Sequence, residues 1–188
     1  MMLSDLIHAA SREADAVRGL KQVYLSLGSN LGDRVAYTRK ALVELNSGGV
    51  EIRRVSSFYK TEPVDFIPQA WFLNCVVEAA TALMPLQLLR AVKGVEWTVG
   101  RRRGVNKGPR PIDIDILLYD NVVVRSAALT VPHPRLGERR FVLIPLRELA
   151  LGAPRPVNRQ TVVEMLQRSR DRSQVTRFRF FDHTSSAR

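Results

Sequence analysis

Residues 101–118 read R-R-R-G-V-N-K-G-P-R-P-I-D-I-D-I-L-L, and this stretch decides how the chain is interpreted. From Ile112 to Leu118 nearly every residue is apolar and favours β-structure, so a buried strand is predicted. The Gly108-Pro109 pair before it indicates a turn. Because side chains alternate along a strand, Asp113 and Asp115 should leave one face together, while isoleucines fill the other.

Two carboxylates side by side repel each other unless a positive charge lies between them. Mg²⁺ suits this position, since proteins usually hold it with one or two carboxylates together with substrate phosphates. Guanidinium groups bind phosphate oxygens in pairs, so Arg101, Arg103 and Arg110 are candidates for holding a polyphosphate. The stretch therefore predicts a site for a metal-bound nucleotide. A solvated strand edge for the aspartates, and a solvated face or nucleic-acid contact for the arginines, are the alternatives.

The run G-P-R-P-I-D-I-D-I-L-L-Y, residues 108–119, closely resembles the signature of 6-hydroxymethyl-7,8-dihydropterin pyrophosphokinases. These enzymes of folate synthesis move a diphosphate from ATP to a pterin alcohol. Other motifs agree with the family in order and spacing from Val23 to Leu166. The resemblance implies an α+β fold, a ferredoxin-like sandwich with helices packed on an antiparallel sheet. The alternation of short strands and helices is compatible with it.

The same resemblance implies roles for individual residues. It implies two Mg²⁺ ions held by Asp113 and Asp115, and catalytic roles for these aspartates together with Arg101 and Arg110. The implied ATP contacts are Glu96, Arg101, Arg103, Arg110, Ile114, His133 and Arg139. The implied pterin contacts are Thr61, Pro63, Val64, Phe72, Asn74, Asp113 and Phe141, with Phe72 and Phe141 on the two sides of the ring.

Several of these residues also have ordinary structural interpretations. Glu96 can form an ion pair with Lys93, which lies one helical turn earlier. Asn74 lies in an apolar strand, where an amide bonded only to the backbone is the alternative to a ligand contact. His133 lies between prolines, and a lone histidine is more often a structural hydrogen-bonding residue.

The chain departs from some members of the family at two positions. Lys107 stands where they have a Trp before the Gly-Pro-Arg, and Pro134 stands where they have a Tyr after the His. The packing of the nucleotide loop and one nucleotide contact are therefore expected to differ.

A Gly-rich segment, G-S-N-L-G-D-R, follows a short predicted strand at Val23–Leu27. Such a turn between strand and helix invites comparison with phosphate-binding loops, but the Lys-Ser/Thr ending of a Walker motif is absent. We therefore expect Gly28, Gly32 and Asp33 to form a tight turn and to cap the helix that follows.

Apolar spacing predicts further elements along the chain. A strand is expected at Glu51–Tyr59, and a helix should run from Pro85 to Gly100, with Pro at its first position and Gly after its last. A second helix is predicted at Thr161–Arg168. Near the end, the run F-R-F-F at Phe178–Phe181 is a candidate edge strand.

Length and composition predict one domain. The chain has 188 residues, 45% of them hydrophobic, which is enough for a single core over residues 23–168. Residues 1–22 are expected to be an extension, which is an added helix, a frayed segment or the result of a start codon placed too far upstream. Residues 169–188 are expected to be a basic, partly disordered tail. Without a long apolar run, a signal peptide or a cysteine besides Cys75, a cytoplasmic protein lacking an internal disulfide is expected.

The net charge of +11 favours anionic partners. The enzyme interpretation expects ATP and the pterin alcohol as partners, without membrane or nucleic acid, and leaves contact with other folate-pathway enzymes open. A nucleic-acid-binding module is the alternative, because ferredoxin-like folds and basic tails also serve RNA. It lacks the aromatic-rich strand motifs of an RNA-recognition sheet and leaves the aspartate pair unexplained. A metal-dependent nuclease is a third interpretation.

Overall fold

The computed structural model describes residues 10–11, 13–64, 69–102, 108–149 and 160–179. Its centre is an antiparallel sheet whose strands pair in the order β5-β1-β4-β3-β8, with β2 also on β4. The strands of this sheet are β1 (Lys21–Ser29), β2 (Val50–Val55), β3 (Tyr59–Thr61), β4 (Phe72–Thr81), β5 (Asp113–Tyr119) and β8 (Val175–Arg177).

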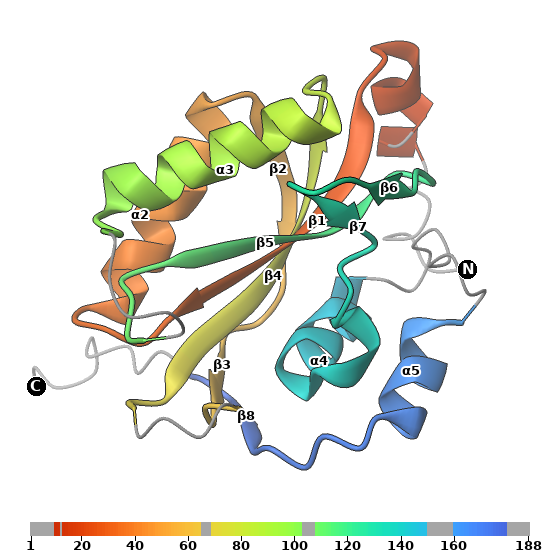
Figure 1. Ribbon diagram of the computed structural model, residues 1–188. Coiled ribbons are helices and arrows are strands. Elements are labelled where there is room, and N and C mark those ends of the chain that lie inside the picture. Colours follow the sequence, from red (N-terminus) through yellow and green to blue (C-terminus); the bar gives the residue numbers. More distant parts are fainter. Residues whose placement is uncertain (1–9, 12, 65–68, 103–107, 150–159, 180–188) are drawn as a thin grey trace, which may run out of the picture.

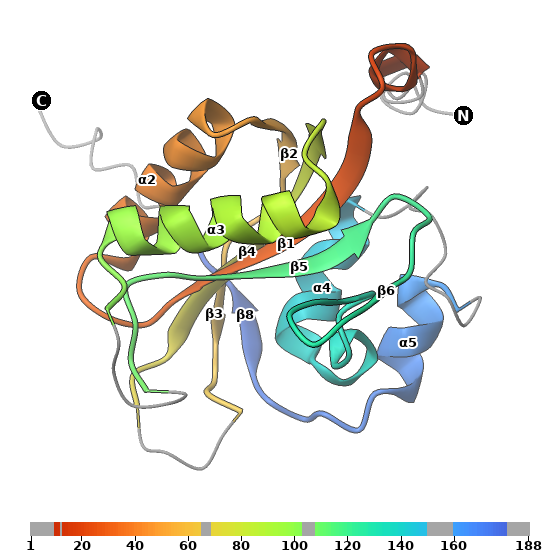
Figure 2. The ribbon, with the colours of Figure 1, turned by 45° about the horizontal axis from the view of Figure 1, so that its top comes forward.

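Helices cover both faces of this sheet, as Figures 1 and 2 show. One face packs against α2 (Arg34–Ser47) and α3 (Pro85–Val99). The other packs against α4 (Arg140–Leu149), which in turn contacts α5 (Val162–Arg168). A small hairpin and a 3₁₀ turn connect β5 to α4, namely β6 (Val124–Arg125), β7 (Thr130–Val131) and η1 (Leu136–Glu138). The expected antiparallel sheet with helices packed on it is confirmed.

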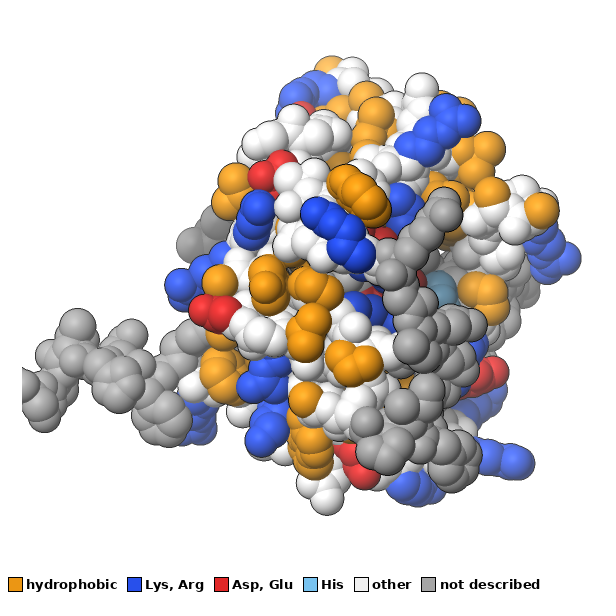
Figure 3. Space-filling view, turned by 60° about the vertical axis from the view of Figure 1, so that its left-hand side comes forward, with side chains coloured by type: hydrophobic (Ala, Val, Ile, Leu, Met, Phe, Trp, Pro, Cys, Tyr) orange, Lys and Arg blue, Asp and Glu red, His pale blue; other side chains and the backbone are white. Residues whose placement is uncertain are grey.

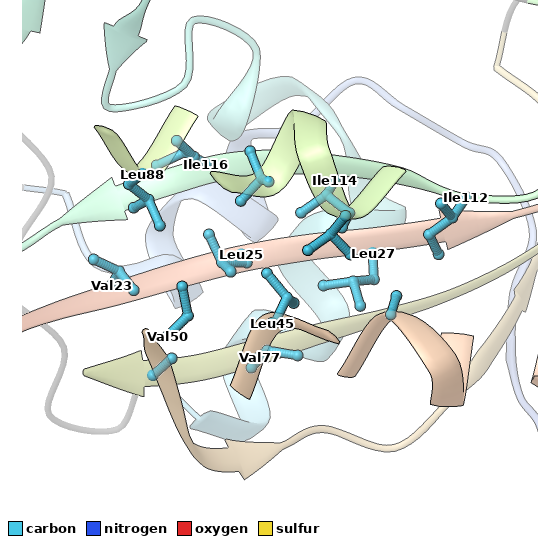
Figure 4. Packing of buried hydrophobic residues seen from close by; sticks show 14 of the residues in the cluster. Val23, Leu25, Leu27, Leu45, Val50, Val77, Leu88, Ile112, Ile114 and Ile116 are labelled. Atoms are coloured by element: carbon cyan, nitrogen blue, oxygen red, sulfur yellow. The ribbon is translucent and has the colours of Figure 1, made fainter. Parts of the chain in front are cut away.

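The core between the sheet and α3 explains the conformation of the central stretch. Ile112, Ile114 and Ile116 are at most 4% exposed and lie in this core beside leucines of β1 (Figure 4). Full burial of such a side chain stabilises the fold by about 1.5–3 kcal/mol. Asp113 and Asp115 leave the opposite face of β5, because side chains alternate along the strand. The predicted strand and its two faces are therefore confirmed.

A second core lies on the other face of the sheet. Leu143 and Leu146 of α4 pack there against Leu117 of β5 and Met165 of α5. Phe141, in the first turn of α4, is only partly buried and packs at the edge of this core. Phe141 also lines the pocket described below, so this pocket lies next to the first turn of α4, on the face of the sheet that carries the aspartates.

The predicted helix ends are confirmed. α3 begins at Pro85, and Gly100 follows it with a φ of 121°, a conformation that favours glycine. In α5 the hydroxyl of Thr161 accepts a hydrogen bond from the Glu164 amide, while the Glu164 carboxylate accepts one from the Thr161 amide. This is the reciprocal pairing of a capping box.

The prediction for the Gly-rich segment is partly wrong. Gly32 has a φ of 58°, and the Asp33 carboxylate accepts a hydrogen bond from the Ala36 amide at 3.0 Å, as expected for a turn and a helix cap. Gly28, however, lies inside β1, because this strand runs two residues beyond the predicted end at Leu27. Its pairing with neighbouring strands on both sides holds it in the sheet.

Two strand predictions also need correction. The strand expected at Glu51–Tyr59 is divided into β2 and β3, because Ser56 interrupts the regular ladder. Its amide donates to the Val76 carbonyl, and its hydroxyl accepts from the Val76 amide, both at 2.9 Å. The edge strand near the C-terminus is β8, which ends before Phe178; residues 180–188 lie outside the described part of the chain.

The described part of the N-terminal extension contacts β2. Residues 13–17 are helical. Asp15 accepts from Arg53 Nε at 3.1 Å, and Arg18 Nη2 lies 2.8 Å from Glu51 Oε1. The Arg18–Glu51 pair is exposed and contributes at most about 1 kcal/mol, whereas the Arg53–Asp15 pair is partly buried. Residues 1–9 and 12 lie outside the described part of the chain.

Cys75 lies fully buried in the central strand β4. Burial raises the pKa of its thiol to about 12, because the thiolate would lose its hydration there. Within the described residues, no helix is both long and apolar enough to cross a membrane.

The segment after α5 holds the beginning of α4. The Asp171 carboxylate accepts hydrogen bonds from the amides of Arg140 and Ser173, each at 2.8 Å. Burial opposes the charge of this carboxylate, but the two amide hydrogen bonds outweigh it and lower the pKa of Asp171. Two residues beyond Ser173, the chain enters β8 and joins the sheet.

Replacement of Asp171 by Ala should lower the free energy of unfolding by about 1–2 kcal/mol, the usual effect of removing a helix cap. For a chain of this size the melting temperature should fall by roughly 2–8 °C. The exposed neighbour Arg170, changed to Ala, serves as the control and should leave the melting temperature unchanged.

The pH dependence of this difference tests its cause. The pKa of Asp171 is lower in the folded chain than in the unfolded chain, where it is about 3.9. The stabilisation is therefore present above that value and is lost as the pH falls through the folded-state pKa. Urea unfolding should show a constant difference near neutral pH that shrinks on acidification, and a difference that grew in acid would contradict the assignment.

Candidate active site

A pocket opens on the sheet face that carries Asp113 and Asp115. Its floor comes from three neighbouring strands. In the pairing of β1 with β4 and β5, Gly28 lies opposite both Asn74 and Asp113, and Ser26 lies opposite Asp115. Directly opposed residues share one face of a sheet, so side chains far apart in the sequence meet here.

Asp113 is held between two arginines. Arg101 Nη1 donates a hydrogen bond to Asp113 Oδ1, and Arg110 Nη2 lies 3.0 Å from Asp113 Oδ2. Burial opposes the charge on Asp113, but the charges of Arg110 and Arg101 outweigh it and lower the pKa of this carboxyl group. Asp113 is therefore ionised at neutral pH although only 20% of its side chain is exposed.

Asp115 is more exposed and less tightly held. Its Oδ2 lies 3.7 Å from Arg139 Nη1 and 4.0 Å from His133 Nε2. Burial lowers the pKa of His133, and the charge of Asp115 opposes this only in part, while Arg139 adds to the lowering. His133 is therefore mainly neutral at neutral pH, and Arg139 is the cation that balances Asp115.

The guanidinium group of Arg110, in the pocket, retains an unused donor. Among the described residues, the buried Nε of Arg110 has no hydrogen-bond acceptor. Buried donors are usually satisfied, and a lost hydrogen bond at such a group costs about 1–3 kcal/mol. Because Arg110 lines the pocket, an anion entering it could supply the missing acceptor.

Two aromatic side chains line the same pocket from different elements. Phe72 comes from β4 and Phe141 from the first turn of α4. The guanidinium carbon of Arg110 lies 5.6 Å from the Phe72 ring centre, and that of Arg139 lies 5.5 Å from the Phe141 ring centre. Each ring therefore has a cation at its face, within the range of a cation–π contact.

The remaining predicted pterin residues also reach this pocket. Thr61, Pro63 and Val64 line one side of it, at and after the end of β3. Asn74 is 3% exposed, and its Nδ2 donates to the Thr61 hydroxyl at 2.7 Å. The amide thus bonds to a side chain of a neighbouring strand, in place of the backbone-only bonding considered as its alternative.

Four of the described residues implied as nucleotide contacts do not line this pocket, namely Glu96, Arg101, Ile114 and His133. Arg101 and His133 lie beside it, at Asp113 and Asp115. Ile114 is 1% exposed and belongs to the core on the opposite face of β5, so its side chain cannot touch a ligand here. Glu96 is 3% exposed, and its carboxylate accepts from Lys93, Arg101 and the Ile114 amide. The structure therefore favours the ion-pair interpretation of Glu96. This carboxylate holds the Arg101 side chain and, through the Ile114 amide, the backbone of β5.

Some expectations fall outside the described residues. Arg103 and Lys107 both belong to the undescribed segment 103–107, so their predicted contacts stay predictions. Arg101 and Arg110, on either side of that segment, both lie at Asp113.

Sequence reasoning missed Asn30, a residue that holds the backbone just before β5. The side-chain oxygen Oδ1 of Asn30 accepts a hydrogen bond from the backbone amide of Arg110 at 2.8 Å. The backbone amide of Asn30 donates one to the backbone carbonyl of Arg110 at 3.2 Å. Asn30 Nδ2 also donates to Gln69 Oε1 at 2.9 Å. The only local signal was a polar residue after an apolar strand, which by itself predicts a turn.

The chemistry of the pocket fits Mg²⁺ that arrives with a polyphosphate. Among the described residues there is no group of three or more His, Cys, Asp or Glu placed to hold a metal. Asp113 and Asp115 offer two carboxylates on one strand face. Mg²⁺ is usually held by so few protein ligands, with phosphate oxygens and water completing its shell.

Several known proteins are similar to this chain. A family model described as 7,8-dihydro-6-hydroxymethylpterin-pyrophosphokinase (HPPK) matches residues 24–151. A relative from Aquifex aeolicus is 44% identical over 142 residues, which are 76% of this chain and 88% of the relative. One from Bacillus subtilis is 46% identical over 127 residues, 67% of this chain and 76% of the relative. Both are named 2-amino-4-hydroxy-6-hydroxymethyldihydropteridine pyrophosphokinase.

Longer proteins contain a similar region as one part. The folate synthesis bifunctional protein of Pisum sativum is 46% identical over 129 residues, 69% of this chain and 25% of that protein. A crystal structure of Plasmodium falciparum HPPK-DHPS with pteroate has a TM-score of 0.63 at 14% identity, covering 79% of this chain. This match covers 42% of that structure and concerns the fold alone. By the family match and its bacterial relatives, the chain belongs to the 7,8-dihydro-6-hydroxymethylpterin-pyrophosphokinase family.

Proposed function

We propose that this chain transfers a diphosphate group from ATP to 6-hydroxymethyl-7,8-dihydropterin, giving the pterin diphosphate and AMP for tetrahydrofolate synthesis. The family assignment supports the pyrophosphokinase activity and ATP as co-substrate. The observation that carries the residue roles is the aspartate pair on one face of β5, balanced by arginines that line the same pocket as two aromatic rings.

Our proposal includes two Mg²⁺ ions held by Asp113 and Asp115. Bound there, Mg²⁺ would neutralise charge on the phosphate oxygens and lower the pKa of the pterin alcohol. The lowered pKa of Asp113 supports this role, because a metal ligand must be deprotonated.

The arginines are proposed to exchange partners when the nucleotide enters. Arg101 and Arg110 pair with Asp113 in the structure, and Arg139 lies closest to Asp115. A polyphosphate offers these groups new oxygen acceptors, which guanidinium binds in a bidentate way. Each cation then keeps an anionic partner throughout, so none has to be buried without compensation.

The pterin is proposed to lie between Phe72 and Phe141, with Pro63 and Val64 beside it. Asn74 would pair with the amide-like edge of the ring, since the hydrogen bond to Thr61 already fixes the orientation of its side chain. The hydroxymethyl group would then point towards Asp113. Stacking on one or both rings contributes about 0.5–1.5 kcal/mol for each aromatic pair beyond the area that it buries.

In the proposed reaction the hydroxymethyl oxygen attacks the β-phosphorus of ATP. The bond between that phosphorus and the oxygen bridging to the α-phosphorus breaks, AMP leaves with the electron pair, and the alcohol proton passes to solvent. Such transfers depend mainly on positioning and on charge stabilisation. Arg101, Arg110 and Arg139 supply fixed positive charge where negative charge shifts between phosphates.

A nucleic-acid-binding function has less support. On the face shown in Figure 3, the Lys and Arg side chains of the described residues are dispersed among hydrophobic and uncharged ones and form no continuous basic stripe. An RNA-binding role would also leave the ionised, arginine-paired Asp113 without a purpose.

The metal role predicts that Asp115→Ala lowers kcat by roughly 10³-fold or more, because charge stabilisation of the phosphates is lost. The side chain is 34% exposed, and among the described residues its nearest cation, Arg139, is 3.7 Å away, so stability should change by only about 0.5 kcal/mol. Steady-state kinetics and thermal unfolding measure the two effects. Glu44→Gln on α2, far from the pocket in sequence and fold, is the control; near-normal turnover of Asp115→Ala would refute the metal role.

A binding titration separates the enzyme from the nucleic-acid interpretation. Calorimetry with a non-hydrolysable ATP analogue should show binding that Mg²⁺ strengthens, followed by binding of the pterin alcohol. Asp113→Asn should reduce the effect of Mg²⁺, because one of its two proposed carboxylate ligands is gone. Binding of single-stranded RNA with an affinity independent of the ATP analogue and Mg²⁺, together with absence of pterin binding, would instead favour the nucleic-acid interpretation.

A further inference from the structure

Gly28 occupies a position where its backbone does not require glycine. The described residues with positive φ include Gly19, Gly32, Gly49 and Gly100, whereas Gly28 lies within the regular part of β1. Glycine weakens a strand interior, because it loses more conformational freedom and packs no side chain. A glycine here therefore has another cause, such as the close approach of a neighbouring group.

That neighbouring group is the side chain of Asn74. A Cβ atom added at Gly28 would lie 2.4 Å from Asn74 Oδ1 and 3.7 Å from Phe72 Cδ1. The first distance is far inside van der Waals contact. Because Gly28 and Asn74 are directly opposite each other in the pairing of β1 with β4, the amide lies across β1 in the space that a Cβ would fill.

The Asn74 amide is thus confined from two sides. On β3, the Thr61 hydroxyl accepts from Nδ2 at 2.7 Å, and on β1 the bare Cα of Gly28 leaves room for Oδ1. Gly28 also lies opposite Asp113 in the pairing of β1 with β5. The floor of the pocket between the amide and the carboxylate is therefore free of any β1 side chain at this position.

We propose that Gly28 is a specificity-determining residue, whose missing Cβ seats the Asn74 amide on the pocket floor. A flat heterocycle with an amide-like edge needs the Asn74 amide in this position, because the edge of the ring pairs with it. The inference rests on the proposed function and extends it to a residue that need not form a hydrogen bond with the ligand. Gly28 acts through the position of Asn74.

An alanine at this position has a specific expected effect. The atom that it would strike is the far end of a flexible side chain, so the Asn74 amide can rotate away without a shift of the sheet. The chain should therefore fold, with the amide displaced from its place between β1 and β3. The three atoms nearest to the added methyl group belong to Asn74 and Phe72, and not to Arg139 or Asp115 on the nucleotide side of the pocket.

The test compares Gly28→Ala with Gly94→Ala, a matched control on α3 whose added Cβ would meet nothing within 4 Å. Calorimetry in saturating Mg²⁺ and ATP analogue should show pterin affinity reduced by about 10–100-fold in Gly28→Ala, as expected for a misplaced buried hydrogen-bonding group. Affinity for the analogue should stay within about twofold in the same variant. Gly94→Ala should match the wild type for both ligands.

A double-mutant cycle tests whether Gly28 acts through Asn74. If it does, Gly28→Ala added to Asn74→Ala should weaken pterin binding by less than about twofold further, because the displaced group is already gone. If the two substitutions instead reduce pterin affinity by factors that multiply in the double variant, the inference is overturned. A crystal structure of Gly28→Ala should show the Asn74 amide rotated away from Thr61, and an unmoved amide would equally overturn it.

The outcomes separate this inference from the proposed function. If Asn74→Ala loses pterin binding while Gly28→Ala keeps it, the inference about Gly28 fails and the proposed function stands. If Gly28→Ala loses stability and both ligands together, its role is structural and the inference also fails. If the wild-type chain does not bind the pterin at all, both are wrong.

Discussion

The repulsion between Asp113 and Asp115 is the constraint on which the rest of the site depends. Both carboxylates leave one face of β5, and burying uncompensated charge there would cost several kcal/mol. Arg101 and Arg110 compensate the charge of Asp113, and among the described residues Arg139 is the cation nearest to Asp115. The arginines that balance the aspartates are thus the same ones that we propose to bind the polyphosphate.

Local sequence was sufficient to predict β5 and its charged neighbours. An apolar run with period two predicts a strand with two different faces, and the structure has the isoleucines in the core and the aspartates in the pocket. Arg110 reaches Asp113 because only two residues separate them in the chain. The same alternation shows why Ile114 cannot line the pocket, a conflict that the resemblance alone did not reveal.

Contacts between distant segments could not be predicted in this way. Asn30 meets the Arg110 backbone only because β1 and β5 are neighbours, and the approach of Asn74 to Gly28 depends on the register of β1 with β4. Phe141 was expected at the pocket from the family resemblance, but what holds it there is the cap that Asp171 provides for the beginning of α4, far along the chain. No local pattern encodes such a cap, because its donor and acceptor belong to separate elements.

The burial of Cys75 has a practical consequence. This thiol is the only one in the chain, and its raised pKa together with complete burial keeps it from reacting with alkylating reagents while the protein is folded. A cysteine engineered on the surface would therefore be the single attachment point for a fluorophore or spin label. Binding of ligands to the candidate site could then be followed spectroscopically without first removing the natural sulfur atom.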